Sequence, residues 1–226
     1  DDYGYFPCVS KGILKAASDG ILTATAIFAN RSCFAEHAGW LRDNTRLDLG
    51  VHLNITDHVP LTTSMQERLA PWGGRFPGKF SAVRALISGR ISIDNVKSEW
   101  RAQIERCLEH DLEIRFLNSH EHMHMLPPLF TLVQSLAQEY GIPHVRFSAS
   151  EPLRDLSAGA VIRDLLIKAM ERLDRPRMRY PAARFIGMTA SGRLGMEYLK
   201  RKLPELKPGP IHELMCHPGC CTPDDI

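Results

Sequence analysis

Short apolar runs alternate with longer amphipathic segments along most of this chain. The runs that we expect to be strands are residues 21–29, 47–56, 114–117, 142–148, 185–189 and 210–219. The segments that we expect to be helices are residues 10–17, 32–43, 80–88, 94–110, 129–140, 158–173 and 192–203. Strands that alternate with helices predict a parallel sheet covered by helices, either open or closed into a barrel. We therefore expect an α/β fold of the TIM-like barrel type with about seven parallel strands.

The bulk composition narrows the class of protein. The 226 residues fit one domain, and we expect residues 1–226 to form a single one. The 28 basic and 26 acidic residues leave a net charge of +2, which argues against a nucleic-acid-binding protein. No stretch of about 18 apolar residues occurs, so we expect no membrane span. We also expect a short apolar strand before Asp1 and a further segment after Ile226.

The cysteines are spread along the chain without the spacing of a disulfide framework. They are Cys8, Cys33, Cys107, Cys216, Cys220 and Cys221. Because the sequence contains no pair of C-x-x-C motifs, a structural zinc site of that kind is not indicated. We therefore expect unpaired cysteines, the adjacent Cys220 and Cys221 included. Since free thiols persist in the reducing cytosol, we also expect a cytoplasmic protein.

A histidine-rich stretch, residues 118–124, directly follows the apolar run 114–117. Its histidines, His120, His122 and His124, stand at alternate positions, which in a strand would send all three side chains to one face. Neutral imidazole is the commonest side-chain metal ligand. The stretch predicts a divalent metal site, or one ligand with polar neighbours, although a solvated strand end would give the same pattern.

Three further polar positions fall at expected strand ends. His52 shares the polar face of run 47–56 with Asn54, and His217 comes just before a Pro-Gly break. Asp1 and Asp2 either form a turn before Gly4 or supply one carboxylate to a metal and one to a reacting water. The carboxyl ends of the strands carry the active sites of α/β barrels, so we expect these groups to converge there.

Residues 57–79 have no hydrophobic periodicity and contain several prolines and glycines. Long loops of this kind inside a domain are usually lids, binding loops or disordered segments. Trp72 and Phe76 offer aromatic rings that either stack on a ligand such as a sugar or pin the loop to the body of the protein.

Taken together, several motifs resemble the YdjC family of carbohydrate deacetylases. They are residues 1–4 (Asp-Asp-Tyr-Gly), 12–14, 20–25, 50–56 (Gly-Val-His-Leu-Asn-Ile-Thr), 119–124 and 213–219, which occur in the same order as in the family. The resemblance implies a deformed (β/α) barrel. It also implies a metal-dependent hydrolase that removes N-acetyl groups from amino sugars or chitooligosaccharide-like glycans and releases acetate. A homodimer is consistent with the resemblance.

Carried over by these motifs, the resemblance assigns Asp2, His52 and His120 as ligands of a divalent metal. It makes Asp1 the general base and His217 the candidate general acid, while His122 and His124 would orient the substrate or support the ligands. The family is generally described with Mg²⁺, and the ligand set would also suit Zn²⁺.

Two departures and two alternatives accompany this assignment. Asn118 stands where the family usually has Asp; it can still accept a hydrogen bond from a ligand histidine, but it carries no charge. Tyr3 replaces the usual Phe. A metal-dependent phosphoesterase is a rival, although such enzymes tend to open with a His-x-His pair. A non-catalytic sugar-binding relic is another, although the intact Asp1 and His217 argue against it.

Overall fold

The computed structural model describes residues 1–42, 46–149, 158–188 and 194–222. The strands in these ranges are β1 (Ala24–Ile27), β2 (Asp48–Leu53), β3 (Ile114–Ser119), β4 (His144–Val145), β5 (Arg184–Ile186) and β6 (His212–Leu214). The α-helices are α1 (Pro7–Ser18), α2 (Phe34–Arg42), α3 (Thr63–Arg68), α4 (Lys79–Ile87), α5 (Ile93–Leu108), α6 (Pro127–Glu139), α7 (Ala158–Asp174) and α8 (Met196–Lys202). The 3₁₀ turns in the same ranges are η1 (Ala70–Trp72), η2 (His120–Met125), η3 (Arg175–Arg177) and η4 (Leu203–Glu205).

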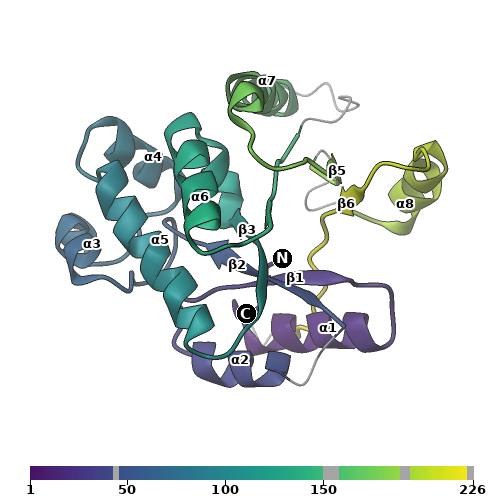
Figure 1. Cartoon of the computed structure of the whole chain (residues 1–226), viewed down its shortest axis with the longest axis horizontal. Helices are drawn as coiled ribbons and strands as arrows, with labels where there is room; N and C mark the ends of the chain where they lie inside the picture. Colours follow the sequence, from purple (N-terminus) through teal and green to yellow (C-terminus); the bar gives the residue numbers. More distant parts are fainter. Residues whose placement is uncertain (43–45, 150–157, 189–193, 223–226) are drawn as a thin grey trace.

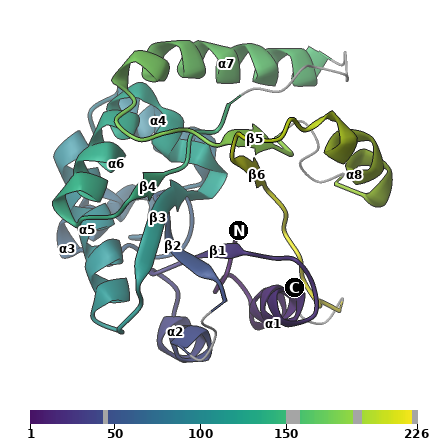
Figure 2. The ribbon, with the colours of Figure 1, turned by 45° about the vertical axis from the view of Figure 1, so that its right-hand side comes forward.

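The sheet follows the order of the chain. Strands β1 to β4 form one parallel sheet in the order β1-β2-β3-β4, and β5 pairs with β6 in a second parallel sheet. Helices α5 and α6 pack against β2, β3 and β4, while α1 and α2 lie below β1 and β2 in the view of Figure 1. In the turned view, α7 lies across the end of the molecule, and the chain after β6 runs back to α1 (Figure 2).

The expected α/β fold with parallel strands is confirmed, and each of the six apolar runs overlaps a strand. β3 extends past its predicted end at Leu117 to Ser119, whereas the other five strands are shorter than predicted. Among the described residues, β4 and β5 belong to different sheets, so closure of the strands into a barrel stays a prediction. The part of the chain that the structure describes contains no helix long and apolar enough to cross a membrane.

Strand β2 lies at the centre of the hydrophobic core. All of its residues after Asp48 are buried, so the polar alternate positions of this run face the interior rather than solvent. Gly50 is required for packing, because a Cβ atom there would lie 2.5 Å from the ring of Phe116 on β3. The absence of a side chain therefore lets the neighbouring strand place a large ring over β2.

The expectation that His120, His122 and His124 share one strand face is wrong. β3 ends one residue before His120, and the chain continues as η2. Within this turn, Glu121 and His122 have left-handed φ angles of 52° and 56°. Two successive left-handed residues turn the chain off its extended path, so the alternation of side chains along a strand does not apply.

The expectation that segment 57–79 is a long loop is wrong in part, because the segment contains α3 and η1. Glu99 of α5 is fully buried, and its two carboxylate oxygens accept hydrogen bonds from the backbone N–H groups of Leu61 and Thr62, each at 2.9 Å. This buried carboxylate satisfies backbone donors that would otherwise lack partners. The start of the segment is therefore tied to the helical layer.

The prediction of free thiols is wrong for two cysteines, because Cys8 and Cys221 form a disulfide. The cysteines that are free in the described part of the chain are Cys33, Cys107, Cys216 and Cys220. A separation of 213 residues between the bonded pair leaves no local spacing that could reveal it. The expectation of a reducing cytosol rested on free thiols and loses that support.

Replacing Gly50 with Ala should lower the free energy of unfolding by about 1–3 kcal/mol, the usual cost of over-packing a core. The new methyl group must displace the Phe116 ring, and urea unfolding measures the loss. The matched control is Gly39→Ala in α2, where the nearest atom to an added Cβ is Arg42 Nη2 at 3.8 Å. That change should stabilise the helix by about 0.5–1 kcal/mol. A Gly50→Ala variant as stable as the parent would contradict the packing argument.

Candidate metal centre

The N-terminal segment lies beside the carboxyl end of β1. Tyr3 forms a parallel bridge with Ile27, and its N–H donates to the carbonyl of Ala26 at 3.2 Å. Asp2, just before this bridge, has a left-handed φ of 66°, a conformation that Asp tolerates better than most residues. Backbone outliers of this kind cluster at functional sites, and here the outlier directs the Asp2 carboxylate across the strand ends.

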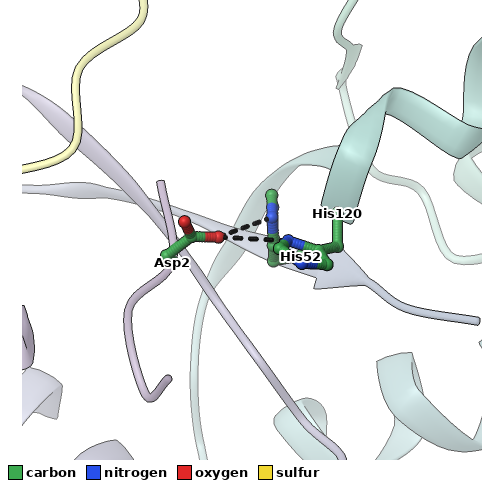
Figure 3. Close-up of side chains that lie close together, drawn as sticks. All are labelled: Asp2, His52 and His120. Carbon is green, nitrogen blue, oxygen red and sulfur yellow. Dashed lines mark ion pairs between the residues drawn. The ribbon is translucent and has the colours of Figure 1, made fainter. Parts of the chain in front are cut away.

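Three side chains from separate segments meet at one point (Figure 3). Oδ1 of Asp2 lies 3.1 Å from Nε2 of His52 on β2 and 3.3 Å from Nδ1 of His120 at the start of η2. The ligand atoms of this triad all lie within 4.8 Å of one another. His52 is buried, whereas Asp2 and His120 are partly exposed. The geometry thus brings together the three residues that the family resemblance assigned as metal ligands.

Asn118 fixes the orientation of His52. The parallel register of β2 and β3 places the two residues side by side. Oδ1 of Asn118 lies 2.7 Å from Nδ1 of His52, and its Nδ2 donates to Oδ1 of Asp1 at 3.0 Å. The NH₂ group of Asn118 donates to the Asp1 carboxylate, so the amide oxygen of Asn118 is the atom that faces His52. This oxygen accepts the proton on Nδ1 of His52. The expectation that Asn118 can accept a bond from a ligand histidine is confirmed.

This arrangement presents donor atoms that suit a cation. Burial lowers the pKa of His52 to about 4, although the neighbouring Asp2 acts in the opposite direction, so the ring is neutral at pH 7. Its single proton is on Nδ1, and Nε2 therefore presents a lone pair to Asp2. Oδ1 of the Asp2 carboxylate is buried without a hydrogen-bond partner in the described part, and a divalent cation would satisfy it.

Asp1, the expected general base, is held by a residue that the sequence analysis did not identify. Arg146, which follows β4 and is 4% exposed, donates from Nη1 and Nη2 to the two oxygens of Asp1 at 2.6 and 2.9 Å. Its Nε donates to Oε1 of Glu213 on β6 at 2.6 Å. This buried arginine therefore pairs with two carboxylates at once. The only sequence indication was a charged residue inside the apolar run 142–148.

His217, the expected general acid, approaches the triad from the C-terminal part of the chain. Its Nε2 lies 3.7 Å from Oδ2 of Asp2, and its side chain is 42% exposed. Burial, together with the positive charge of the amino terminus, lowers the pKa of His217 to about 4. The imidazole thus stands at the open side of the triad as a neutral group at pH 7.

The other two histidines of the cluster point away from the triad. Nδ1 of His122 lies 2.8 Å from Oγ of Ser148, and burial lowers the pKa of this ring well below its usual value. His124 is fully buried, with Nδ1 2.7 Å from Oγ of Ser119 and Nε2 3.1 Å from the carbonyl of Arg146. Both ring nitrogens of His124 are engaged, so its placement suits support of the strand end rather than contact with a substrate.

The two predicted aromatic residues of segment 57–79 pack against the body of the protein. Phe76 is 6% exposed and belongs to the core, which leaves no open face for a sugar. Trp72 is partly buried against the same core, and the guanidinium of Arg90 lies 5.8 Å from its ring centre. These positions favour the alternative in which both rings pin the segment.

A polar cluster that the sequence analysis did not identify borders the triad; we call its residues Tyr5, Arg31, Asp57 and His58 the Asp57 cluster. Oδ2 of Asp57 accepts the Tyr5 hydroxyl at 2.7 Å and lies 3.3 Å from Nε2 of His58. The Arg31 guanidinium lies 4.4 Å from the centre of the Tyr5 ring. Asp57 and His58 are 33% and 28% exposed, so they remain accessible.

The Asp57 cluster adjoins the triad directly, because the Tyr5 and His120 rings lie 5.9 Å apart. Burial and the bond to Asp57 raise the pKa of Tyr5 to about 12, so its hydroxyl remains a donor. Burial would raise the pKa of Asp57, but the Tyr5 hydroxyl and the neighbouring cations outweigh it and lower that pKa. His58 also has a left-handed φ of 62°. No periodic pattern in the sequence around Asp57 and His58 identifies these residues.

Comparison with known proteins identifies the family of the chain. The model of the YdjC-like protein family matches residues 1–226. The carbohydrate deacetylase of Geobacillus stearothermophilus is 30% identical over 183 residues, which cover 76% of this chain and 71% of the relative. For that of Mus musculus, the values are 28% over 241 residues, 97% of this chain and 76% of the relative. The carbohydrate deacetylase of Brevibacillus brevis is 29% identical over 144 residues, which cover 63% of this chain and 55% of the relative. The chain thus spans between about half and three quarters of these relatives.

A solved structure supports the fold. A protein from Enterococcus faecalis V583, described provisionally as a cellobiose-phosphate cleavage protein, matches with a TM-score of 0.74. The alignment covers 97% of this chain and 78% of that chain at 22% sequence identity. At this identity the likeness extends to the fold and no further.

Replacing Asn118 with Leu should weaken binding of a divalent metal by about 10- to 100-fold, the usual effect of losing a group that orients a ligand. Leu removes both the acceptor for His52 and the donor to Asp1. Titration calorimetry with Mg²⁺ and with Zn²⁺ measures the change. The matched control, Asn118→Asp, keeps the acceptor for His52 and should bind metal at least as tightly as the parent. Equal affinity in the two variants would contradict the orienting role.

Proposed function

Since the chain belongs to the YdjC-like protein family, we propose that it is a metal-dependent hydrolase that removes N-acetyl groups from amino sugars and releases acetate. Relatives named carbohydrate deacetylases support the reaction class. The observation that carries the metal dependence is the triad itself, in which a buried carboxylate oxygen without a hydrogen-bond partner faces two imidazole nitrogens. The substrate class that we propose is N-acetylated amino sugars or chitooligosaccharide-like glycans.

Asp2, His52 and His120 would hold the metal. One carboxylate and two imidazoles leave coordination positions open for a substrate, as catalytic sites require. When bound, a divalent metal polarises the acetamide carbonyl and lowers the pKa of a water molecule. We propose Mg²⁺ from the family likeness, with Zn²⁺ as the alternative that two nitrogen ligands favour.

The remaining residues would move the protons. Asp1, whose carboxylate is fixed by Arg146 and Asn118, would accept the proton of the attacking water. His217 would protonate the amine nitrogen that leaves the acetyl carbon. Since its free imidazole is neutral at pH 7, His217 must gain a proton before this step. The products are acetate and a free amino sugar.

The Asp57 cluster would contact the sugar that carries the acetamido group. A carboxylate, an imidazole and a phenol supply the donors and acceptors that bind sugar hydroxyls. The cluster borders His120 through Tyr5, so a sugar whose acetamido group lies at the triad would extend toward Asp57 and His58. This placement gives the cluster a role in choosing the substrate, separate from the chemistry at the triad.

The (β/α) barrel and the single domain over residues 1–226 also remain proposals. Their support is the strand order, in which both sheets are parallel and follow the chain. In a barrel of this type, consecutive strands are neighbours all the way around. Two junctions among the described strands would then be unpaired: one between β4 and β5, and one between β6 and the β1 edge of the larger sheet.

Replacing His52 or His120 with Ala should abolish acetate release from N-acetylated chitooligosaccharides and reduce bound metal after dialysis by at least about 100-fold. Each change removes one of three ligands. Acetate is measured by an enzyme-coupled assay and metal by atomic emission. His110→Ala, which changes a histidine at the end of α5, serves as the control and should retain both properties. Full activity in either ligand variant would contradict the metal assignment. Turnover of phosphate esters, or sugar binding without acetate release, would favour the phosphoesterase or the non-catalytic alternative.

Replacing Tyr5 with Phe should raise KM by roughly 2- to 12-fold with little effect on kcat, which corresponds to the loss of one hydrogen bond of about 0.5–1.5 kcal/mol. The ring stays against His120, so the triad and its metal affinity are unchanged. Steady-state kinetics with chitobiose and longer oligomers measures the effect. The control, Tyr140→Phe, removes a hydroxyl that bonds Glu105 on the helical layer. A selective loss of metal in Tyr5→Phe would contradict a role confined to substrate binding.

A further inference from the structure

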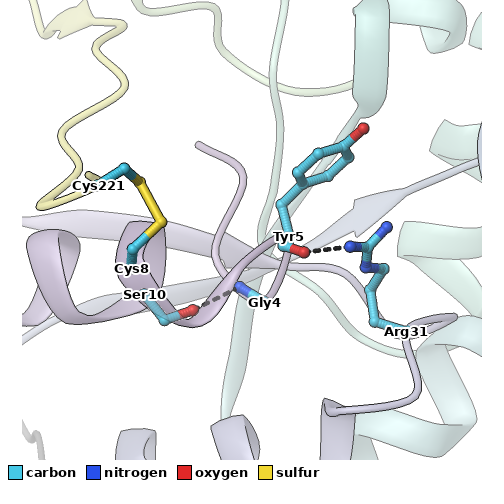
Figure 4. Close-up of a disulfide and its surroundings, with 6 residues drawn as sticks. All are labelled: Gly4, Tyr5, Cys8, Ser10, Arg31 and Cys221. Atoms are coloured by element: carbon cyan, nitrogen blue, oxygen red, sulfur yellow. Dashed lines mark hydrogen bonds between the residues drawn. A yellow bond between two sulfur atoms is a disulfide. The ribbon is translucent and has the colours of Figure 1, made fainter. Parts of the chain in front are cut away.

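Helix α1 anchors two segments that meet at the proposed active site. Oγ of Ser10 accepts the backbone N–H of Gly4 at 2.9 Å, which ties the segment that carries Asp2 to the helix. On the same helix, Cys8 is bonded to Cys221, and the carbonyl of Cys8 accepts the N–H of Cys220 at 3.1 Å. Figure 4 shows both attachments on the first turn of α1. The helix therefore fixes the N-terminal and C-terminal segments relative to each other.

We call residues 215–222 the C-terminal strap; they follow β6 and form no helix or strand. At its start, the N–H of Met215 donates to the carbonyl of Ile186 at 2.9 Å, and the carbonyl of Cys216 accepts from the amino group of Asp1 at 3.1 Å. At its end lie the bonds to Cys8. His217 stands in the span between these attachments, so both ends of the strap determine where its imidazole lies.

The strap lies directly on the backbone of α1. A Cβ atom added at Gly12 would fall 2.5 Å from Cα of Gly219 and 2.8 Å from the N of Cys220. These are backbone atoms, which cannot move aside as the end of a side chain can. The bare backbone at Gly12 thus provides the close contact that the disulfide holds together.

We propose that the Cys8–Cys221 disulfide is a positioning device for His217: it holds the strap against α1 so that the imidazole stands beside Asp2. This proposal rests on the proposed function of the site. Reduction by a dithiol such as dithiothreitol breaks the S–S bond and transfers two electrons and two protons, giving two cysteine thiols and one cyclic disulfide. The metal ligands lie outside the strap, so reduction should change the place of His217 and leave the triad intact.

The first experiment compares the oxidised and reduced protein. Without reductant, peptide mapping should recover Cys8 linked to Cys221. Reduction, or Cys8→Ser, should lower kcat by about 10- to 100-fold, the range expected when a reacting group is displaced by about an ångström. KM and metal affinity should change by less than about twofold. Cys220→Ser, which changes the adjacent exposed cysteine, is the matched control and should respond to reductant as the parent does.

Two further variants separate positioning from general stability. Gly12→Ala pushes the strap away from α1 without altering any sulfur atom, so it should lower kcat as Cys8→Ser does. Because Ala favours a helix more than Gly does, the change should not weaken α1 itself. In a His217→Ala background, neither Cys8→Ser nor reduction should lower kcat further, because a tether that acts through His217 has nothing left to position. All assays are made well below the melting temperature of each variant.

Three results would overturn the proposal. They are free Cys8 and Cys221 in the oxidised protein, an unchanged kcat after reduction, or an equal further loss in the His217→Ala background. Failure of the proposed function is recognised separately, because the oxidised parent would then release no acetate. In that event, hydrogen exchange of residues 215–222 tests whether the disulfide holds the strap in place. Faster exchange after reduction, with no change at β2 and β3, would support the proposal. Unchanged exchange would overturn it.

Discussion

The parallel pairing of β2 with β3 is the constraint on which the candidate metal centre depends. It puts His52 beside Asn118 and the end of β2 beside the start of η2, where His120 lies. A slip of one residue would turn His52 to the opposite face of the sheet. The register shifts between Leu49 and Gly50, next to the point where the Phe116 ring packs on the glycine. The packing of the Phe116 ring on Gly50, two residues before His52, thus helps to determine where the His52 imidazole points.

From this pair of strands a polar network extends to the rest of the site. Asn118 links His52 to Asp1, and Arg146 links Asp1 to Glu213 on the second sheet. Each member has a partner with good geometry, which a buried network needs if it is to fix one arrangement. Because Asn can donate as well as accept, it joins a neutral imidazole to a carboxylate, which an ionised Asp could not do.

The family resemblance supplied the choice of Asp2, His52 and His120 as ligands. The apolar runs around His52 and before His120 predicted only that polar groups at strand ends would converge. The sequence could not predict how His122 and His124 lie, since the left-handed turn at Glu121 and His122 has no marker such as glycine. Arg146 was hidden for a related reason: a lone charge in an apolar run has no visible partner until the chain folds. The disulfide was hidden by distance along the chain, and the residues of the Asp57 cluster by the lack of periodicity around them.

The two sheets divide the proposed chemistry between them. The metal ligands come from the first 120 residues, namely the N-terminal segment, β2 and the turn after β3, whereas His217 follows β6. A group that transfers a proton must be placed as accurately as the ligands, because small displacements cost large factors in rate. The two strands of the smaller sheet, β5 and β6, are only three residues long each, so they give His217 little support. Placement of His217 therefore depends on bonds back to the first part of the chain: Arg146 to Glu213, Asp1 to Cys216, and Cys8 to Cys221.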